Sequence, residues 1–254
     1  MAEFEAVRRA GSGVRTTEID AGLRAHMNKV YGLMSIAMIV TGAVAWVFGV
    51  DAANVVNGRE TGLIPQGIVE AIYFSPLRWV IMFAPLVMVF AMGAMVNRMS
   101  EAGLQFFFYA FSAVMGLSIS WIFAVFTGYS IAQTFFVTAI AFAGLSLWGY
   151  TTKKDISGWG SFLIMGVIGL IVASIVNIFL QSPAMMFAIS ALGVLIFAGL
   201  TAYDTQRIKN EYLMMRDGGG EAYLGKAAIM GAVSLYINFI NLFMFLLQFL
   251  GDRE

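Results

Sequence analysis

Asp204 is the acidic residue that ends a long apolar stretch, within the segment 203–206 (Tyr-Asp-Thr-Gln). A carboxylate in this position can bind a cation or a proton, and ionisable groups within apolar spans usually mark ion or proton pathways. Arg207 follows at the i,i+3 spacing, so Asp204 also fits an ordinary ion pair at a membrane surface, worth about 0.3 kcal/mol. The residues alone leave both interpretations open.

Arg98 is a basic residue that ends another apolar interval, 79–97. Basic residues at the end of a membrane helix are ordinary anchors on the cytoplasmic side. Because we expect Arg98 and Asp204 on the same side of the membrane, Arg98 is also a candidate counter-ion for that carboxylate. These two charged residues are therefore our first candidates for an ion-sensing or proton-sensing role.

The last apolar stretch, 227–251, carries polar residues on one helical face: Ser234, Asn238, Asn241 and Gln248. Their spacing follows the helical repeat, so their side chains point in one direction. Such residues often hydrogen-bond neighbouring helices in a membrane bundle. The alternative is that this face lines a polar path, with Ser234 and Asn241 along it and Asn238 between them.

Signatures of known enzymes are missing from the chain. There is no cysteine, and the one histidine, His26, is expected to be solvated in a polar N-terminal segment. No His-Glu-x-x-His or Gly-x-Ser-x-Gly motif occurs, and the run 218–220 (Gly-Gly-Gly) lacks the Lys-Ser or Lys-Thr of a phosphate-binding loop, so it predicts a plain loop. A formal net charge of zero gives no basic excess for nucleic acid. We therefore expect neither enzymatic activity nor nucleic-acid binding.

Composition and charge spacing point to a membrane protein. Hydrophobic residues make up 60% of the chain and charged residues 12%, against roughly 25% charged residues in soluble domains. Two intervals without Asp, Glu, Lys or Arg, 102–152 and 156–203, are each about twice as long as one membrane-spanning helix. The sequence therefore predicts an integral, multi-pass protein whose surroundings are the lipid bilayer.

Turn residues divide the two long intervals. The segment 127–130 (Thr-Gly-Tyr-Ser) breaks the first, and 181–183 (Gln-Ser-Pro) breaks the second, with Pro183 suited to the first turn of a helix. The sequence thus predicts an all-α protein with a seven-helix transmembrane domain over 29–251. We expect its helices near 30–50, 78–97, 104–126, 131–150, 160–180, 184–204 and 227–250.

Lysine and arginine residues set the orientation of these helices. With the N-terminus inside, the inner segments carry twelve of them and the outer segments three. This asymmetry predicts a cytoplasmic N-terminal tail, 1–28, and a C-terminal end, 252–254, on the outside. The largest outer loop, 51–76, is expected to cap the outer face.

Two segments in the C-terminal part resemble motifs of the Bax inhibitor-1 family, especially its bacterial YccA-like branch. They are 203–206 (Tyr-Asp-Thr-Gln) and 234–243 (Ser-Leu-Tyr-Ile-Asn-Phe-Ile-Asn-Leu-Phe). The segments 153–157 and 177–179, followed by the helix start at Pro183, fit the same pattern. The resemblance covers residues 25–251, which is nearly the whole chain.

The resemblance implies a bundle in which six helices in two layers surround the C-terminal helix. It also implies a pH-sensitive calcium leak channel, with calcium or other cations as partners. In the better studied members, an aspartate on helix six faces another on helix seven, and such a like-charged pair can hold a proton near neutral pH. An arginine at the inner end of helix two pairs with the helix-six aspartate in the closed form. Asp204 matches that aspartate, and Arg98 falls where that arginine is expected.

Asn238 stands where the family has its second aspartate, within 237–241 (Ile-Asn-Phe-Ile-Asn). An amide can still form hydrogen bonds but carries no charge. We therefore expect proton-sensitive gating to be weakened or moved to more acidic pH. Hard cations favour carboxylate oxygens, so we also expect Asp204 alone to be a weak calcium ligand, and we expect no other cofactor.

A second hypothesis is a regulatory interaction protein without transport of its own. Members of the YccA-like branch are associated with modulation of a membrane-bound AAA protease, and the N-terminal tail, 1–28, suits such a role or a role in a stress response. The same resemblance implies a bacterial inner membrane with the C-terminus in the periplasm. The two hypotheses differ in whether Asp204 or the tail carries the function.

Overall fold

The computed structural model describes residues 2–215 and 221–253, and the side chains of 21–215 and 223–253. These residues form helices, with no β-structure among them apart from an isolated bridge between Phe126 and Arg253. The predicted glycine loop at 218–220 lies outside the described residues, and so does Glu254 of the predicted C-terminal end.

Seven of the described helices are long and apolar enough to cross a membrane. They are α1 (Ala2–Val56, spanning within Ala21–Val56), α3 (Leu77–Met95), α4 (Glu101–Ile119, extended by the 3₁₀-helix η1, Ser120–Ala124), α5 (Gly128–Thr151), α6 (Trp159–Leu180), α7 (Pro183–Met215) and α8 (Glu221–Leu250). The prediction of an all-α membrane protein with seven transmembrane helices is therefore confirmed.

Both predicted breaks in the long apolar intervals are helix boundaries. Thr127 caps the start of α5, where its hydroxyl accepts a hydrogen bond from the backbone N–H of Ser130 at 3.2 Å. Gln181 ends α6 in the left-handed conformation with φ 48°, and α7 begins at Pro183. The local turn chemistry of these residues thus separates two pairs of spanning helices.

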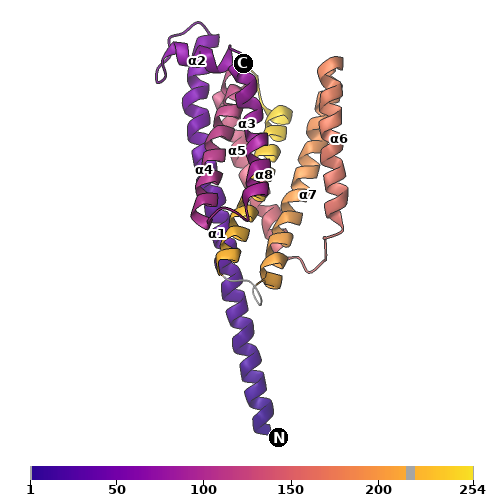
Figure 1. The fold of residues 1–254 in the computed structure, drawn as a ribbon. Helices are drawn as coiled ribbons and strands as arrows, with labels where there is room; N and C mark the ends of the chain where they lie inside the picture. Colours follow the sequence, from indigo (N-terminus) through magenta and orange to yellow (C-terminus); the bar gives the residue numbers. More distant parts are fainter. Residues whose placement is uncertain (1, 216–220, 254) are drawn as a thin grey trace.

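The first helix is longer than the sequence indicated. We expected a tail over 1–28 and a helix near 30–50, but α1 is continuous over Ala2–Val56 and projects beyond the bundle (Figure 1). The prediction that His26 is solvated is wrong, because the residue is only 8% exposed and its ring lies 4.8 Å from that of Tyr212 in α7. The last part of the expected tail therefore packs against the bundle.

The loop between α1 and α3 is organised by a buried carboxylate. The Oδ atoms of Asp51 accept hydrogen bonds from the backbone N–H groups of Gly62, Leu63 and Ile64, at 2.7 to 2.9 Å. The short helix α2 (Gln66–Tyr73), which the sequence did not reveal, follows this turn. Asp51 thus holds the loop against the end of α1.

The C-terminal helix α8 occupies the centre of the bundle. It packs against α1, α4, α5 and α7, whereas α3 packs on α4 and α6 packs on α7 (Figure 1). In the apolar window of α8, 67% of the residues are buried, against 33% or less in the other spanning helices. The other helices therefore shield the polar side chains of α8 from lipid.

A small residue fixes the position of α7 just before Asp204. Gly149 of α5 is buried, and a Cβ at this position would collide with the backbone of Ala202 in α7. Small residues let membrane helices approach each other this closely. The contact holds α7 between α5 and α8.

Candidate functional site

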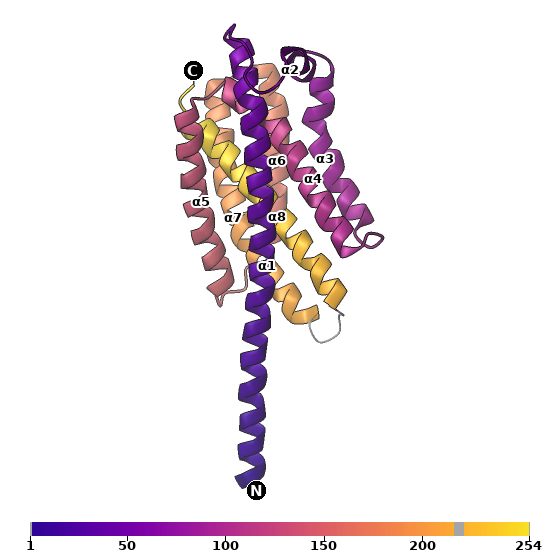
Figure 2. The same cartoon turned by 90° about the vertical axis from the view of Figure 1, so that its left-hand side faces the viewer.

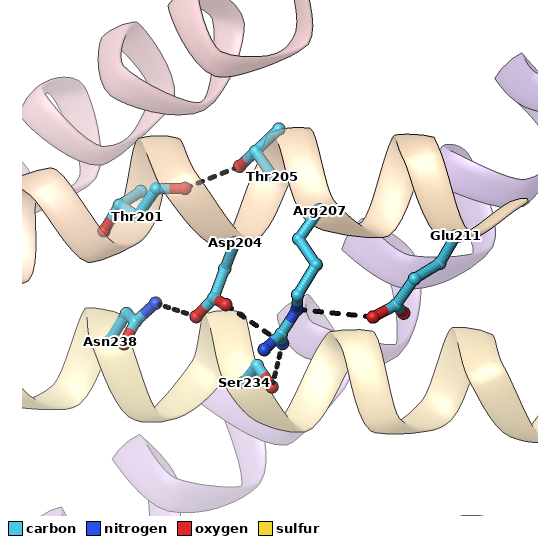
Figure 3. Close-up of polar contacts among 7 residues, drawn as sticks. All are labelled: Thr201, Asp204, Thr205, Arg207, Glu211, Ser234 and Asn238. Atoms are coloured by element: carbon cyan, nitrogen blue, oxygen red, sulfur yellow. Dashed lines mark hydrogen bonds and ion pairs between the residues drawn. The ribbon is translucent and has the colours of Figure 1, made fainter. Parts of the chain in front are cut away.

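Asp204 is a buried carboxylate between α7 and α8, with 7% of the residue exposed. Its Oδ2 accepts a hydrogen bond from Nδ2 of Asn238 at 2.7 Å, and its Oδ1 lies 2.9 Å from Nη2 of Arg207 (Figure 3). Hydrogen bonds to an ionised group are about twice as strong as those between neutral groups. The structure thus brings together Asp204 and Asn238, which the sequence singled out from two different helices.

Arg207 supplies the positive charge of this site. Besides Asp204, its Nη2 donates a hydrogen bond to Oγ of Ser234 in α8 at 3.1 Å. Its Nε lies 3.5 Å from Oε1 of Glu211, a charge contact without hydrogen-bond geometry. A planar guanidinium can serve several acceptors at once, so Arg207 joins two acids of α7 to a hydroxyl of α8 (Figure 3).

Close packing of α7 on α8 positions these groups. Ala228 and Ala232 of α8 are fully buried, and Gly231 of α8 faces the side chain of Ile208 in α7. The hydroxyls of Thr201 and Thr205 donate to carbonyl oxygens of their own helix at 2.8 Å, so they do not compete for Asp204 (Figure 3). Asp204 therefore keeps Asn238 of α8 and Arg207 of its own helix as its partners.

The polar face of α8 mostly serves contacts with α7. Ser234 and Asn238 bond to Arg207 and Asp204, and Oε1 of Gln248 accepts a hydrogen bond from Ser190 of α7 at 3.3 Å. Asn241 differs, because its Nδ2 donates to the carbonyl oxygen of Ile237 in its own helix at 2.9 Å. Three of these polar residues thus link two helices, as the first of the two interpretations expected.

Arg98 lies apart from the carboxylate for which it was a candidate counter-ion. It is exposed in the connection between α3 and α4, and no contact with Asp204 occurs among the described residues. The ion pair of Asp204 is made by Arg207, one helical turn away on the same helix. The sequence signal for this pair was the i,i+3 spacing of the two residues.

The site offers few ligands for a bound cation. Calcium takes six to eight oxygen ligands, usually from several carboxylates and carbonyls. Among the described side chains, 21–215 and 223–253, no group of three or more acidic or histidine residues lies close enough to hold a metal ion. Both oxygens of Asp204 are already engaged, so the residues present do not fit a resident calcium ion.

Two further motif residues make contacts that were not foreseen from the sequence. The side-chain amide of Gln206 donates to the carbonyl oxygen of Lys154 at 2.8 Å and accepts from the N–H of Ile156 at 2.9 Å. The buried hydroxyl of Tyr236 lies 2.6 Å from Oγ1 of Thr41 in α1. Gln206 thus ties the α5–α6 loop to α7, and Tyr236 ties α8 to α1.

Comparisons with known proteins agree with this architecture. A family model described as inhibitor of apoptosis-promoting Bax1 matches residues 23–254. The inner membrane protein YbhL of Escherichia coli strain K12 is 41% identical over 92% of this chain and 94% of its own length. An uncharacterised protein of Caulobacter vibrioides is 49% identical over 93% of this chain and 92% of its own, and one of Rickettsia prowazekii is 39% identical over 92% of each. The chain therefore belongs to the Bax inhibitor-1 family of membrane proteins.

Proposed function

We propose that this protein is a calcium leak channel whose closed form is held by the contact between α7 and α8 at Asp204. The observation that carries the proposal is that this buried carboxylate is bonded to both Asn238 and Arg207. A buried acid that is paired with a base and placed between two central helices is a natural control point for an ion pathway. Opening would require the bond between Asp204 and Asn238, which joins α7 to α8, to separate.

Arg207 takes the role in this gate that the family resemblance had given to Arg98. Its guanidinium holds both Asp204 and the hydroxyl of Ser234, so it links α7 to α8 directly. Separating the two helices would break the bond from Arg207 to Ser234 and the bond from Asn238 to Asp204, and leaving these groups unpaired in a region of low dielectric is costly. These two bonds between the helices therefore favour the closed form.

Asn238 makes this gate less responsive to protons than a pair of facing acids. Its Nδ2 donates to Asp204, whereas an aspartate in its place would repel that carboxylate unless one of the two held a proton. Among the described side chains, Asp204 is thus the acid of α7 that hydrogen-bonds α8 directly. We propose a pH response that is weakened or displaced to acidic pH.

We further propose that the protein resides in a bacterial inner membrane, with the N-terminus in the cytoplasm and the C-terminus in the periplasm. The name of the Escherichia coli relative, an inner membrane protein, supports the location. The twelve-to-three distribution of lysines and arginines supports the orientation. Calcium is cargo in this proposal, since the residues at Asp204 do not form a resident site.

Calcium flux into liposomes tests the channel proposal. Purified protein is reconstituted around a calcium-sensitive dye, and Asp204→Ala is compared with the wild type. We expect Asp204→Ala to raise the flux, because it removes the acid that Arg207 and Asn238 hold. Asp155→Ala, at an exposed acid in the α5–α6 loop, is the matched control and should leave the flux unchanged. A flux no greater than that of empty liposomes would contradict the proposal.

The alternative is a regulatory protein that acts on a membrane-bound AAA protease or a stress response without transport. The projection of α1 beyond the bundle supports this alternative, because a helix free of the bundle can contact a partner (Figure 1). Deleting residues 2–20 separates the two proposals, since this deletion spares the buried Leu23, His26 and Met27. Loss of the cellular effect with unchanged flux would favour the regulatory role.

A further inference from the structure

A long apolar groove separates α1 from α5. Among the described residues the backbones of these two helices stay apart, and α8 lies behind the gap between them (Figure 2). One cavity of about 790 Å³ lies between α1 and α5 and reaches Phe239 of α8. A second, of about 440 Å³, continues it and reaches Ile240 and Phe243. Both cavities share Met38, Gly42 and Phe135, and together we call them the lateral groove.

The lateral groove lies at the depth of the membrane core. Its lining on α1 runs from Arg24 to Trp46 within the spanning part of that helix. At 1.5 Å per residue, this distance is about 33 Å, close to the roughly 30 Å of the hydrocarbon core. Its rims carry exposed apolar side chains, including Ile39 and Leu147. Hydrocarbon chains of the bilayer therefore have direct access to it.

One end of the lateral groove is polar and basic. Arg24 and Asn28 line this end, together with Tyr150 of α5. Nζ of Lys209 lies 2.8 Å from the carbonyl oxygen of Tyr150, which brings a second positive charge to this end. No acidic residue occurs among the described lining residues of either cavity. The groove thus combines an apolar trough with a cationic end, the pattern expected for a lipid with an anionic headgroup.

The dimensions favour an acyl chain over a protein helix. The cavity follows α1 over about 27 Å, from Arg24 to Gly42 at 1.5 Å per residue, and has a volume of about 790 Å³. A flexible hydrocarbon chain is much narrower than a helix, which is about 10 Å wide, and it fits this space without any movement of α1 or α5.

We propose that the lateral groove binds an anionic phospholipid, such as phosphatidylglycerol, with its phosphate at Arg24 and Asn28 and an acyl chain between α1 and α5. This acyl chain lies against Phe239 of α8, the helix that also carries Asn238. The groove is a binding site separate from the contact at Asp204, and the proposal does not depend on calcium transport.

Native mass spectrometry of protein released from vesicles with equal phosphatidylglycerol and phosphatidylcholine tests the proposal. We expect the wild type to retain one lipid and to prefer phosphatidylglycerol. Arg24→Gln should lower this preference about fivefold, the effect of one basic residue near an anionic headgroup. Lys153→Gln, an exposed residue that lines neither cavity of the groove, should keep it. Equal retention of the two lipids by the wild type would overturn the proposal.

Filling the lateral groove provides the steric test. A Cβ at Gly42 meets no atom within 4 Å, so Gly42→Leu should fold while its side chain blocks the trough, and the retained lipid should be lost. Gly32→Leu, equally open on the same helix but outside the groove, is the matched control. Ala143→Leu on the α5 wall, compared with its neighbour Gly144→Leu, repeats the test if Gly42→Leu does not fold. The proposal would be overturned if a folded groove-filling variant retained the lipid as the wild type does. It would also be overturned if a second copy of the protein occupied the groove in place of the lipid.

Discussion

Asp204 is held by residues that are unequal in strength and in exposure. Asn238 is 4% exposed, whereas the side chain of Arg207 is 39% exposed. Water therefore screens the ion pair in part, which places its contribution nearer to that of a surface pair than to that of a fully buried one. The hydrogen bond from Asn238 is shielded from this screening. The bond from Asn238 joins Asp204 to α8, and the ion pair with Arg207 orients the carboxylate within α7.

Removing the guanidinium of Arg207 should weaken this contact. Arg207→Gln takes away the charge beside Asp204 and the hydrogen bond to Ser234, so we expect the free energy of unfolding to fall by about 1–2 kcal/mol. Glu211→Gln removes only a 3.5 Å contact between half-exposed groups and should cost less than about 0.5 kcal/mol. Thermal unfolding in the same detergent compares the two variants. Equal losses would show that Arg207 acts through Glu211 rather than through Asp204.

Two residues of the site, Asp204 and Asn238, were predictable from the sequence, but the basic partner of Asp204 was not. Asp204 and Asn238 were found because a polar residue in an apolar helix is conspicuous and because both lie in motifs of a known family. Which arginine pairs with Asp204, Arg98 or Arg207, was not predictable, since it depends on how the α3–α4 connection lies relative to α7. The link from Gln206 to the α5–α6 loop likewise depends on tertiary placement.

The helices that frame the site are fixed by close approach at small residues. Gly149 lies against the backbone of α7, and Gly116 of α4 lies in the same way against the backbone of α1 at Thr41. In a membrane, where lipid is as apolar as the helices, such close packing supplies much of the helix association. The position of α7 therefore depends on the absence of a side chain at Gly149.

Adding a side chain at Gly149 should separate α5 from α7. We expect Gly149→Leu to lower the free energy of unfolding by about 1–3 kcal/mol, because the carbonyl group of Ala202 leaves no room for a Cβ. Gly144→Leu, on the same helix, meets no atom within 4 Å and should be nearly neutral. Thermal unfolding of the two variants measures the difference. A Gly149→Leu protein as stable as Gly144→Leu would contradict the proposed packing.

Helix boundaries were predictable where they depend on local chemistry. The break at 127–130 follows from the cap at Thr127, and the break at 181–183 follows from a left-handed residue before Pro183. The start of the first helix was not predictable, because its polar residues resemble a solvated tail. His26 is buried and packs against Tyr212, which is far away in the sequence.

For the whole molecule, the charge distribution predicts an orientation that the chain is well suited to test. It contains no cysteine, so any introduced cysteine is the single thiol. With the N-terminus in the cytoplasm, Arg59→Cys in the outer loop should react with a membrane-impermeant maleimide added to spheroplasts. Lys153→Cys should react only after the membrane is permeabilised. The reverse labelling pattern would contradict the orientation.

The number of spanning helices followed from charge-free intervals, but the lateral groove did not. Composition and periodicity show which segments cross the membrane, and they contain no information on which spanning helices remain apart. The separation of α1 from α5 follows from the way α8 packs against both of them. Such a groove becomes visible only when the bundle is assembled.

A control for pH measurements comes from an acid outside the spanning helices. The backbone N–H and the hydroxyl of Ser157 hydrogen-bond the carboxylate of Asp155 and hold its pKa below its usual value. A lowered pKa keeps an acid ionised through the range from mildly acidic to neutral pH, so Asp155 does not change charge there. Asp155→Asn should therefore leave the pH dependence of calcium flux unchanged.

Calcium flux measured against pH, for Asn238→Asp and for the wild type, tests whether Asn238 weakens the response of the gate at Asp204 to protons. Asn238→Asp places a second acid at 2.7 Å from Asp204, and such a pair takes up and releases a proton nearer to neutral pH. We expect the wild type to respond weakly or only at acidic pH, and the variant to respond near neutral pH. Asp155→Asn should follow the wild type. Identical pH profiles for the wild type and Asn238→Asp would show that Asn238 does not set the pH response.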